Sequence, residues 1–177
     1  MSKQFILWSM VIFPLFTLFF MKKEDRKRYT PVALLTAVTT SIISESGITL
    51  KLWAAKETLF PLNQIPPFIY VSIPVFTMWI FKFTYGRFWH YLAANAIIDF
   101  GFAYLILPWL VRVGIMELLS SSLLVYLMNF VHEFILYGYQ MWQNELLVPA
   151  KKKTNLSILQ PVIAKPLYNK DKNNNKE

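Results

Sequence analysis

Apolar residues dominate five separate stretches of the chain, and polar or charged residues collect in the short segments between them. A helix needs about 20 predominantly apolar residues to cross a bilayer, within a range of roughly 17 to 25. All five stretches have close to that length, and they lack the apolar–polar alternation of a half-buried strand. We therefore predict five spanning helices, at residues 5–21, 31–50, 66–83, 89–111 and 114–136.

The first stretch has a second interpretation, as a cleaved secretory signal peptide with Lys3 as its charged start. Two features favour a retained helix instead. A cleavage site of small residues does not follow the stretch, whereas a dense basic cluster does: Lys22, Lys23, Arg26, Lys27 and Arg28. We interpret residues 5–21 as the first span.

Prolines and polar segments predict where the helices begin, bend and end. Pro31 suits the first turn of the second helix, where its missing N–H costs nothing, and Thr30 is the expected N-cap. Pro74 predicts a kink near the centre of the third helix. We expect residues 51–65 to lie on the membrane surface and residues 150–177 to form a basic, disordered tail.

Composition and charge support a membrane protein and suggest its orientation. The chain of 177 residues is 55% hydrophobic and 16% charged, against roughly 25% charged residues in a typical soluble domain. With five spans, 14 of the 18 Lys and Arg residues fall on one side of the membrane, which the positive-inside rule assigns to the cytoplasm. The predicted fold is all-α, a polytopic transmembrane bundle over residues 1–149. Its N-terminus is outside the plasma membrane and its tail is cytoplasmic.

Ionisable residues inside the spans are the candidate functional residues. A charged side chain at the bilayer centre costs about 2.5–3.5 kcal/mol on insertion scales, so it usually faces the bundle interior and finds a partner. Asp99 lies ~15 Å into the fourth span, near the midplane, at a helical rise of ~1.5 Å per residue. Asn95 lies one turn earlier on the same face. Glu45 lies deep in the second span, nearer its outer end.

A second polar group lies toward the cytoplasmic end of the fifth span and consists of Asn129, His132 and Glu133. One interpretation of these residues is a proton or cation path, or a polar substrate pocket, with Asp99 as the midplane carboxylate. The other is structural: Asp99 is a neutral acid bonded to Asn95 or to a threonine of the second span, and it joins two helices. The residue pattern leaves both interpretations open.

Several chemistries are disfavoured by the residues present. The chain has no Cys, which removes disulfides, thiolate nucleophiles and thiolate metal sites. The string HEFIL begins like the zinc-protease motif, but Leu136 stands where the second His belongs. Glycine-rich phosphate loops and the G-x-S-x-G motif are absent. We expect no metal, no cofactor and no catalytic residue. The expected partners are the lipid bilayer and other membrane proteins or copies of this chain, and not nucleic acid.

Several strings, taken together, resemble a family of membrane proteins. They are DRKRYTPVAL at 25–34, GITLKLW at 47–53, KETLFP at 56–61 and FTYGRFW at 83–89, followed by Asn95 and Asp99. The set is similar to a family of small, uncharacterised multi-pass membrane proteins of Gram-positive spore-forming bacteria, over roughly residues 20 to 140. The resemblance implies a polytopic plasma-membrane protein of about five helices. It supplies no established activity and no catalytic residues.

Three functions are compatible with these observations. The first is a non-enzymatic accessory or interaction subunit of a larger assembly, because short-looped helices without a catalytic constellation leave little for the chain to do alone. The second is a small oligomeric transporter or channel that uses the carboxylates of Asp99 and Glu45. The third is a membrane-embedded lipid enzyme that works through His132, Glu133 and Asn129, with His132 as the acid or base.

Overall fold

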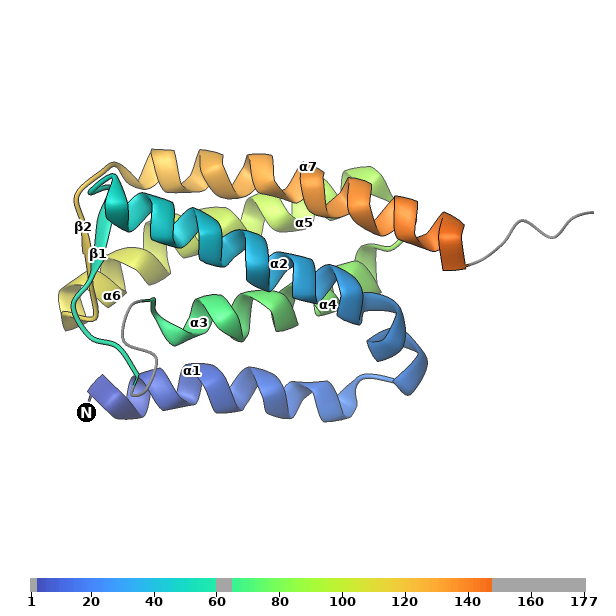
Figure 1. Cartoon of the computed structure of the whole chain (residues 1–177), viewed down its shortest axis with the longest axis horizontal. Helices are drawn as coiled ribbons and strands as arrows, with labels where there is room; N and C mark the ends of the chain where they lie inside the picture. Colours follow the sequence, from blue (N-terminus) through green and yellow to red (C-terminus); the bar gives the residue numbers. More distant parts are fainter. Residues whose placement is uncertain (1–2, 60–64, 148–177) are drawn as a thin grey trace, which may run out of the picture.

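A computed structural model describes residues 3–59 and 65–147, which form helical rods that run side by side (Figure 1). The helices are α1 (Lys3–Thr17), α2 (Lys23–Thr49), α3 (Pro67–Tyr70), α4 (Ser72–Thr84), α5 (Phe88–Gly101), α6 (Leu107–Val113) and α7 (Ser122–Leu147). A short 3-10 turn, η1 (Leu18–Phe20), extends α1, and a π-helical segment, η2 (Phe102–Ile106), joins α5 to α6. The predicted tail, residues 150–177, lies outside the described residues.

Four of the rods are long and apolar enough to cross a membrane: Lys3–Phe20, Lys23–Thr49, Pro67–Thr84 and Phe88–Val113. They correspond to the first four predicted spans. The fifth prediction was wrong in its bounds, because the chain leaves the helical conformation after Val113 and α7 begins only at Ser122. Among the described residues, α7 is not one of these four rods, since Asn129, His132 and Glu133 interrupt its apolar sequence.

The start of α2 also differs from the prediction. The helix begins about two turns before Pro31, so the basic cluster and this proline lie inside one continuous helix. Thr30 is not an N-cap, because its hydroxyl donates a hydrogen bond to the carbonyl of Arg26 at 2.5 Å, as in a helix interior. Glu24 and Asp25 favour the earlier start, since acidic side chains in a first turn interact favourably with the helix dipole.

The third rod is interrupted, as its proline content predicts, but the break lies at Val71, about one turn after the rod begins at Pro67, and not near the centre as predicted. Helix α3 ends at Tyr70 and α4 begins at Ser72, with Val71 at φ −123° and ψ −56° between them. Pro74 explains the interruption, because it has no N–H for the carbonyl of Tyr70 and its ring clashes with that oxygen.

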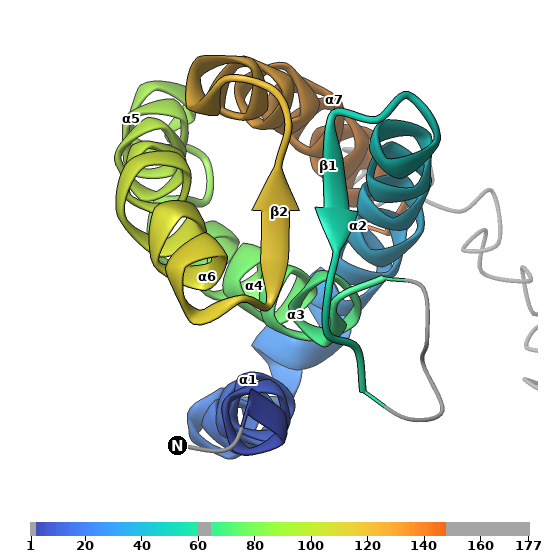
Figure 2. The same cartoon turned by 90° about the vertical axis from the view of Figure 1, so that its left-hand side faces the viewer.

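Two short strands close one end of the bundle. Strands β1 (Trp53–Ala55) and β2 (Met116–Leu118) pair antiparallel, with Ala54 opposite Glu117. Figure 2 looks onto this end and shows the strands lying across a ring of helices, with α1 outside the ring. We call the two strands the cap, the end that they close the cap end, and the opposite end the base. Residues 51–65 therefore contain part of the cap.

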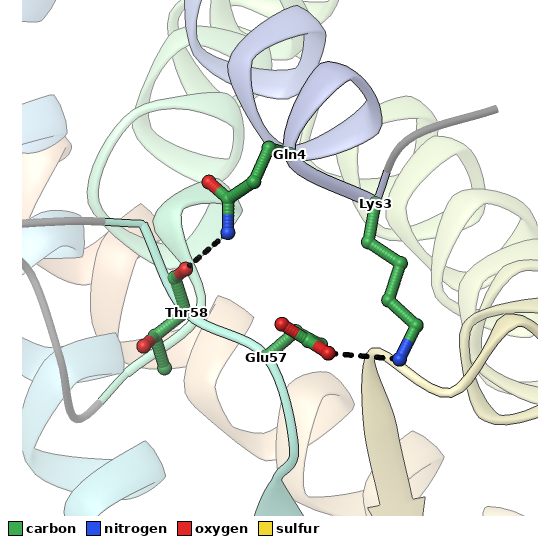
Figure 3. Close-up of polar contacts among 4 residues, drawn as sticks. All are labelled: Lys3, Gln4, Glu57 and Thr58. Carbon is green, nitrogen blue, oxygen red and sulfur yellow. Dashed lines mark hydrogen bonds and ion pairs between the residues drawn. The ribbon is translucent and has the colours of Figure 1, made fainter.

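Helix α1 is fastened to the segment that follows β1. The ammonium group of Lys3 pairs with the Glu57 carboxylate at 2.8 Å, and the side-chain amide of Gln4 donates a hydrogen bond to the Thr58 carbonyl at 3.1 Å (Figure 3). Farther along its length, α1 packs against α3 and α4. The helix is thus attached to one side of the ring.

Candidate functional site

Buried apolar side chains form two clusters, one beneath the cap and one toward the base. The cap-side cluster includes Leu7, Trp53, Phe68, Leu107, Leu110 and Val125. The base-side cluster includes Tyr29, Val32, Met78, Phe81, Tyr91 and Leu136. Each cluster draws residues from several rods, so burial of these side chains holds the bundle together at two levels.

Polar side chains occupy the level between the two apolar clusters. On α7, Val125 belongs to the cap-side cluster and Leu136 to the base-side cluster, and the buried His132 lies between them. On α5, the buried Asp99 lies about two turns beyond Tyr91 in the direction of the cap. We call this group the polar layer, and its members are Thr36, Thr39, Asn95, Asp99, His132 and Glu133.

Tyr91 and Glu133 connect α5 to α7 at the lower edge of the polar layer. The Tyr91 side chain is 1% exposed, and its hydroxyl donates a hydrogen bond to Oε2 of Glu133. The side-chain amide of Asn95 donates to the backbone carbonyl of Tyr91 at 3.0 Å. The Asn95 amide is therefore bonded within its own helix, and the contact between helices is made by Tyr91.

Asp99 has a buried carboxylate with an unpartnered oxygen. The residue is 9% exposed, and its Oδ2 accepts no hydrogen bond within the part of the chain that the structure describes. It lies within electrostatic range of Tyr91 and of Glu133. An ionised carboxylate without a partner is costly in a membrane interior, and such residues typically mark proton relays or ion paths.

His132 and Thr39 connect α7 to α2 within the same layer. Nε2 of His132 lies 2.6 Å from the Thr39 hydroxyl oxygen. That hydroxyl has a single hydrogen, and it also lies 2.8 Å from the carbonyl of Leu35. The direction of the hydrogen bond between Nε2 and Thr39 is set by the tautomer of His132, and the bond joins α7 to α2 with either tautomer. The threonine thus bonds its own backbone and the histidine rather than Asp99.

A cavity of about 70 Å³ separates the polar layer from the cap. Its polar lining comes from Thr40, Ser44 and Asn129, and its apolar lining includes Trp53 of the cap and Phe102 of η2. A buried water requires roughly 10–15 Å³ of such space and two to four polar partners. The cavity therefore has room for several waters and is far smaller than typical ligand pockets of about 300–1,000 Å³.

The structure brings together most, but not all, of the residues that the sequence singled out. Asn95, Asp99, His132 and Glu133 lie in the polar layer, and Asn129 lines the adjacent cavity. Glu45 lies elsewhere, exposed on α2 near the cap end and within electrostatic range of Tyr70. The carboxylate that shares a site with Asp99 is therefore Glu133.

Sequence reasoning missed Tyr91. Its position four residues before Asn95 and eight before Asp99 places it on the same face of α5, so helical spacing was the signal that could have identified it. Among the described residues, no group of three or more His, Asp or Glu side chains is arranged to hold a metal ion.

No protein-family model matches the chain, and neither a curated protein nor a solved structure shows significant similarity to it. The fold itself defines the class. Four helices that are long and apolar enough to cross a bilayer indicate a predominantly helical membrane protein with a polar layer in its interior.

Proposed function

We propose that this chain is a non-enzymatic multi-pass protein of the plasma membrane whose polar layer binds and releases protons during transport. The carrying observation is the buried Asp99 carboxylate, which has an unpartnered oxygen and lies within electrostatic range of the Tyr91–Glu133 pair. The resemblance to small membrane proteins of spore-forming bacteria supports the location. The distribution of basic residues supports a cytoplasmic C-terminus and an external N-terminus.

The size of the interior space supports a proton rather than an organic solute as the transported species. The cavity beneath the cap, at about 70 Å³, has room for waters that could carry a proton toward the polar layer. Apolar clusters lie on both sides of that layer. A site closed toward both ends is what alternating access requires, because each side must open separately.

We further propose that α7 is the fifth spanning helix. Its 26 residues extend for about 39 Å, more than the ~30 Å of a hydrocarbon core. Its polar residues Gln140 and Gln143 are buried inside the bundle, so they lower its overall apolar content without facing lipid. Apart from Glu145 near its end, the large side chains that it exposes are apolar or aromatic: Leu123, Leu127, Val131, Phe134, Ile135 and Trp142.

Proton flux into liposomes tests the transport proposal. Purified protein is reconstituted with a pH-sensitive dye inside the vesicles, and a pH step is applied outside. We expect Asp99→Asn to reduce the flux at least about tenfold, equivalent to about 1.4 kcal/mol in the barrier. Glu45→Gln is the matched control, since this carboxylate is exposed and outside the polar layer. Equal flux in wild type and Asp99→Asn would reject the proposal.

An accessory subunit of a larger assembly is the second candidate, and the exposure of α1 favours it. Only 11% of the apolar stretch Lys3–Phe20 is buried against the rest of the chain. The rod carries exposed aromatic residues: Phe5, Trp8, Phe13, Phe16, Phe19 and Phe20. In-cell crosslinking followed by purification in mild detergent separates the candidates. A stoichiometric protein partner supports a subunit, and an isolated chain that conducts protons supports transport.

A further inference from the structure

Arg28 is held in place at the base, where α2, α7 and the link between α4 and α5 meet. Its guanidinium carbon lies 3.7 Å from the centroid of the Tyr85 ring. Its Nε donates a hydrogen bond to Oδ1 of Asn144 at 3.2 Å. Figure 1 shows the start of α2 and the end of α7 at the same end of the bundle. The Arg28 side chain therefore links three segments that are far apart in the sequence.

Asn144 is itself fixed, so it presents a hydrogen-bond acceptor to Arg28. Its side-chain amide donates to the backbone carbonyl of Gln140 at 2.6 Å, which turns the amide nitrogen toward its own helix. Oδ1 then faces two donors, Nε of Arg28 and Nε2 of Gln140, the second at 3.4 Å. The Gln140 side chain is completely buried. These contacts distinguish Arg28 from a solvated surface arginine, whose side chain samples many rotamers.

The positive charge of Arg28 has no carboxylate partner in the described part of the chain. Glu24 and Asp25 lie four and three residues earlier, on the same face of α2, but neither forms an ion pair with it. Both ion pairs among the described residues lie at the cap end instead. Asn144 engages Nε alone, so the hydrogens of the two Nη nitrogens have no acceptor among the described residues. One positive charge and one donor edge are thus available to a ligand.

The free edge of Arg28 matches a phosphate group. A guanidinium presents its N–H groups in a rigid planar fork, and two parallel N–H groups can bond two oxygens of one phosphate. Tyr85 covers a face of the guanidinium and Asn144 occupies Nε, so the pair of Nη nitrogens is the edge that remains. Because the ring and the hydrogen bond already hold the fork, binding a phosphate there costs less side-chain entropy than on a mobile arginine.

Arg28 lies at the level of lipid headgroups if the rods are inserted in a membrane. The residue before it, Lys27, is exposed, whereas the residue after it, Tyr29, belongs to the buried base-side cluster. On α7, Trp142 lies two residues before Asn144 and is 57% exposed. Tryptophan is enriched at the membrane–water interface. Basic pockets between spanning helices at this level typically bind anionic headgroups.

We propose that Arg28, held by Tyr85 and Asn144, binds a phosphate group at the base through its two Nη nitrogens. We call this the base site. A phospholipid of the base-side leaflet and a soluble phosphate share this chemistry, and the position at headgroup level favours the lipid. The lipid assignment rests on the membrane insertion proposed above, and the base site is independent of the proton site. A bound headgroup would add a further contact where α2 and α7 meet.

Native mass spectrometry of the full chain, with phosphatidylglycerol added in steps, tests the base site. Arg28→Lys keeps the charge and loses the planar fork, so we expect it to bind the lipid about tenfold more weakly than wild type. Lys27→Gln is the matched control, because it removes a charge from the adjacent, exposed residue, and we expect it to bind like wild type. Equal affinity of wild type and Arg28→Lys, or a larger loss in Lys27→Gln, would overturn the proposal.

A second pair of variants tests how Arg28 is held. Tyr85→Phe retains the ring beneath the guanidinium and should bind phosphatidylglycerol like wild type. Tyr85→Leu removes the ring and should bind it severalfold more weakly. The midpoint of thermal unfolding without added lipid shows that each variant is folded before its affinity is compared. Equal affinity of the two Tyr85 variants would contradict the role of the ring, and Arg28→Lys tests the site even where Tyr85→Leu does not fold.

Two further ligands separate a lipid from a soluble phosphate. Diacylglycerol has no phosphate, so we expect wild type and Arg28→Lys to bind it equally. We expect inorganic phosphate not to displace phosphatidylglycerol from wild type. Displacement by inorganic phosphate that is lost in Arg28→Lys would support the base site and overturn the lipid assignment. Asp99→Asn should bind phosphatidylglycerol like wild type, so a failed proton proposal leaves this result unchanged. Recovery of wild type in the soluble fraction would reject membrane insertion and the lipid assignment together.

Discussion

Tyr91 holds a partly buried carboxylate in place, because its hydroxyl is a donor to Oε2 of Glu133. In Tyr91→Phe the ring remains in the base-side cluster and only the donor is lost. An acceptor left unpaired at a buried site costs about 1–3 kcal/mol, so we expect a lower midpoint of thermal unfolding in detergent. Tyr137→Phe is the control, since its ring centroid lies 5.1 Å from that of Tyr91 and its hydroxyl makes no hydrogen bond within the described residues. Equal midpoints for both variants would contradict the assigned role.

For single residues, the sequence predicted which side chains share a helix face but not which residues of other helices contact them. Helical spacing places Asn95 and Asp99 on one face of α5, and the structure has both buried there. The carboxylate that accompanies Asp99 comes from α7 rather than from Glu45 on α2. The sequence of α5 places Asn95 and Asp99 on one face of the helix, but it does not specify which neighbouring helix packs against that face. That choice depends on how the helices pack, which spacing along one helix does not contain.

Among the secondary-structure elements, the cap depends on a close approach between β1 and the end of α2. A Cβ on Gly47 would lie 1.9 Å from Cζ2 of Trp53, so any larger residue displaces the indole ring. We expect Gly47→Ala to destabilise the protein by about 1–3 kcal/mol, as overpacking does. Gly101→Ala is the matched control, because nothing lies within 4 Å of its Cβ position and Ala is the better helix former. Thermal unfolding of the two variants measures the difference, and equal destabilisation would contradict this account of the cap.

Rods were predictable from the sequence, whereas the cap was not. Length and apolar composition identify four of the rods, because each is a long stretch of predominantly apolar residues. Strands β1 and β2 contain three residues each, which is too short for an alternating pattern to stand out. The two strands pair Trp53 with Leu118, and helices α3 to α6 lie between them in the sequence. The pairing therefore depends on the tertiary structure. The early start of α2 was missed because Pro31 is a helix-start signal that here lies inside the helix.

For the whole molecule, the order of rods gives a clear expectation for the two ends. Helices α2 and α7 are antiparallel neighbours, since Arg28 bonds Asn144 near the base and Thr39 meets His132 at mid-height. The cap end therefore holds the start of α7, and the base holds the start of α2 and the end of α7. The dense basic cluster lies at the base, so the positive-inside rule assigns that end to the cytoplasm.

Labelling of single cysteines tests this orientation and the fifth span together. The chain has no Cys, so each introduced thiol is unique. Ser121 lies at the cap end and Glu24 and Glu145 lie at the base, and all three are exposed. We expect a membrane-impermeant thiol reagent to label Ser121→Cys in intact cells. We expect it to label Glu24→Cys and Glu145→Cys only after permeabilisation. The reverse pattern would invert the orientation. Labelling of Glu145→Cys, but not of Glu24→Cys, in intact cells would show that α7 does not cross the membrane.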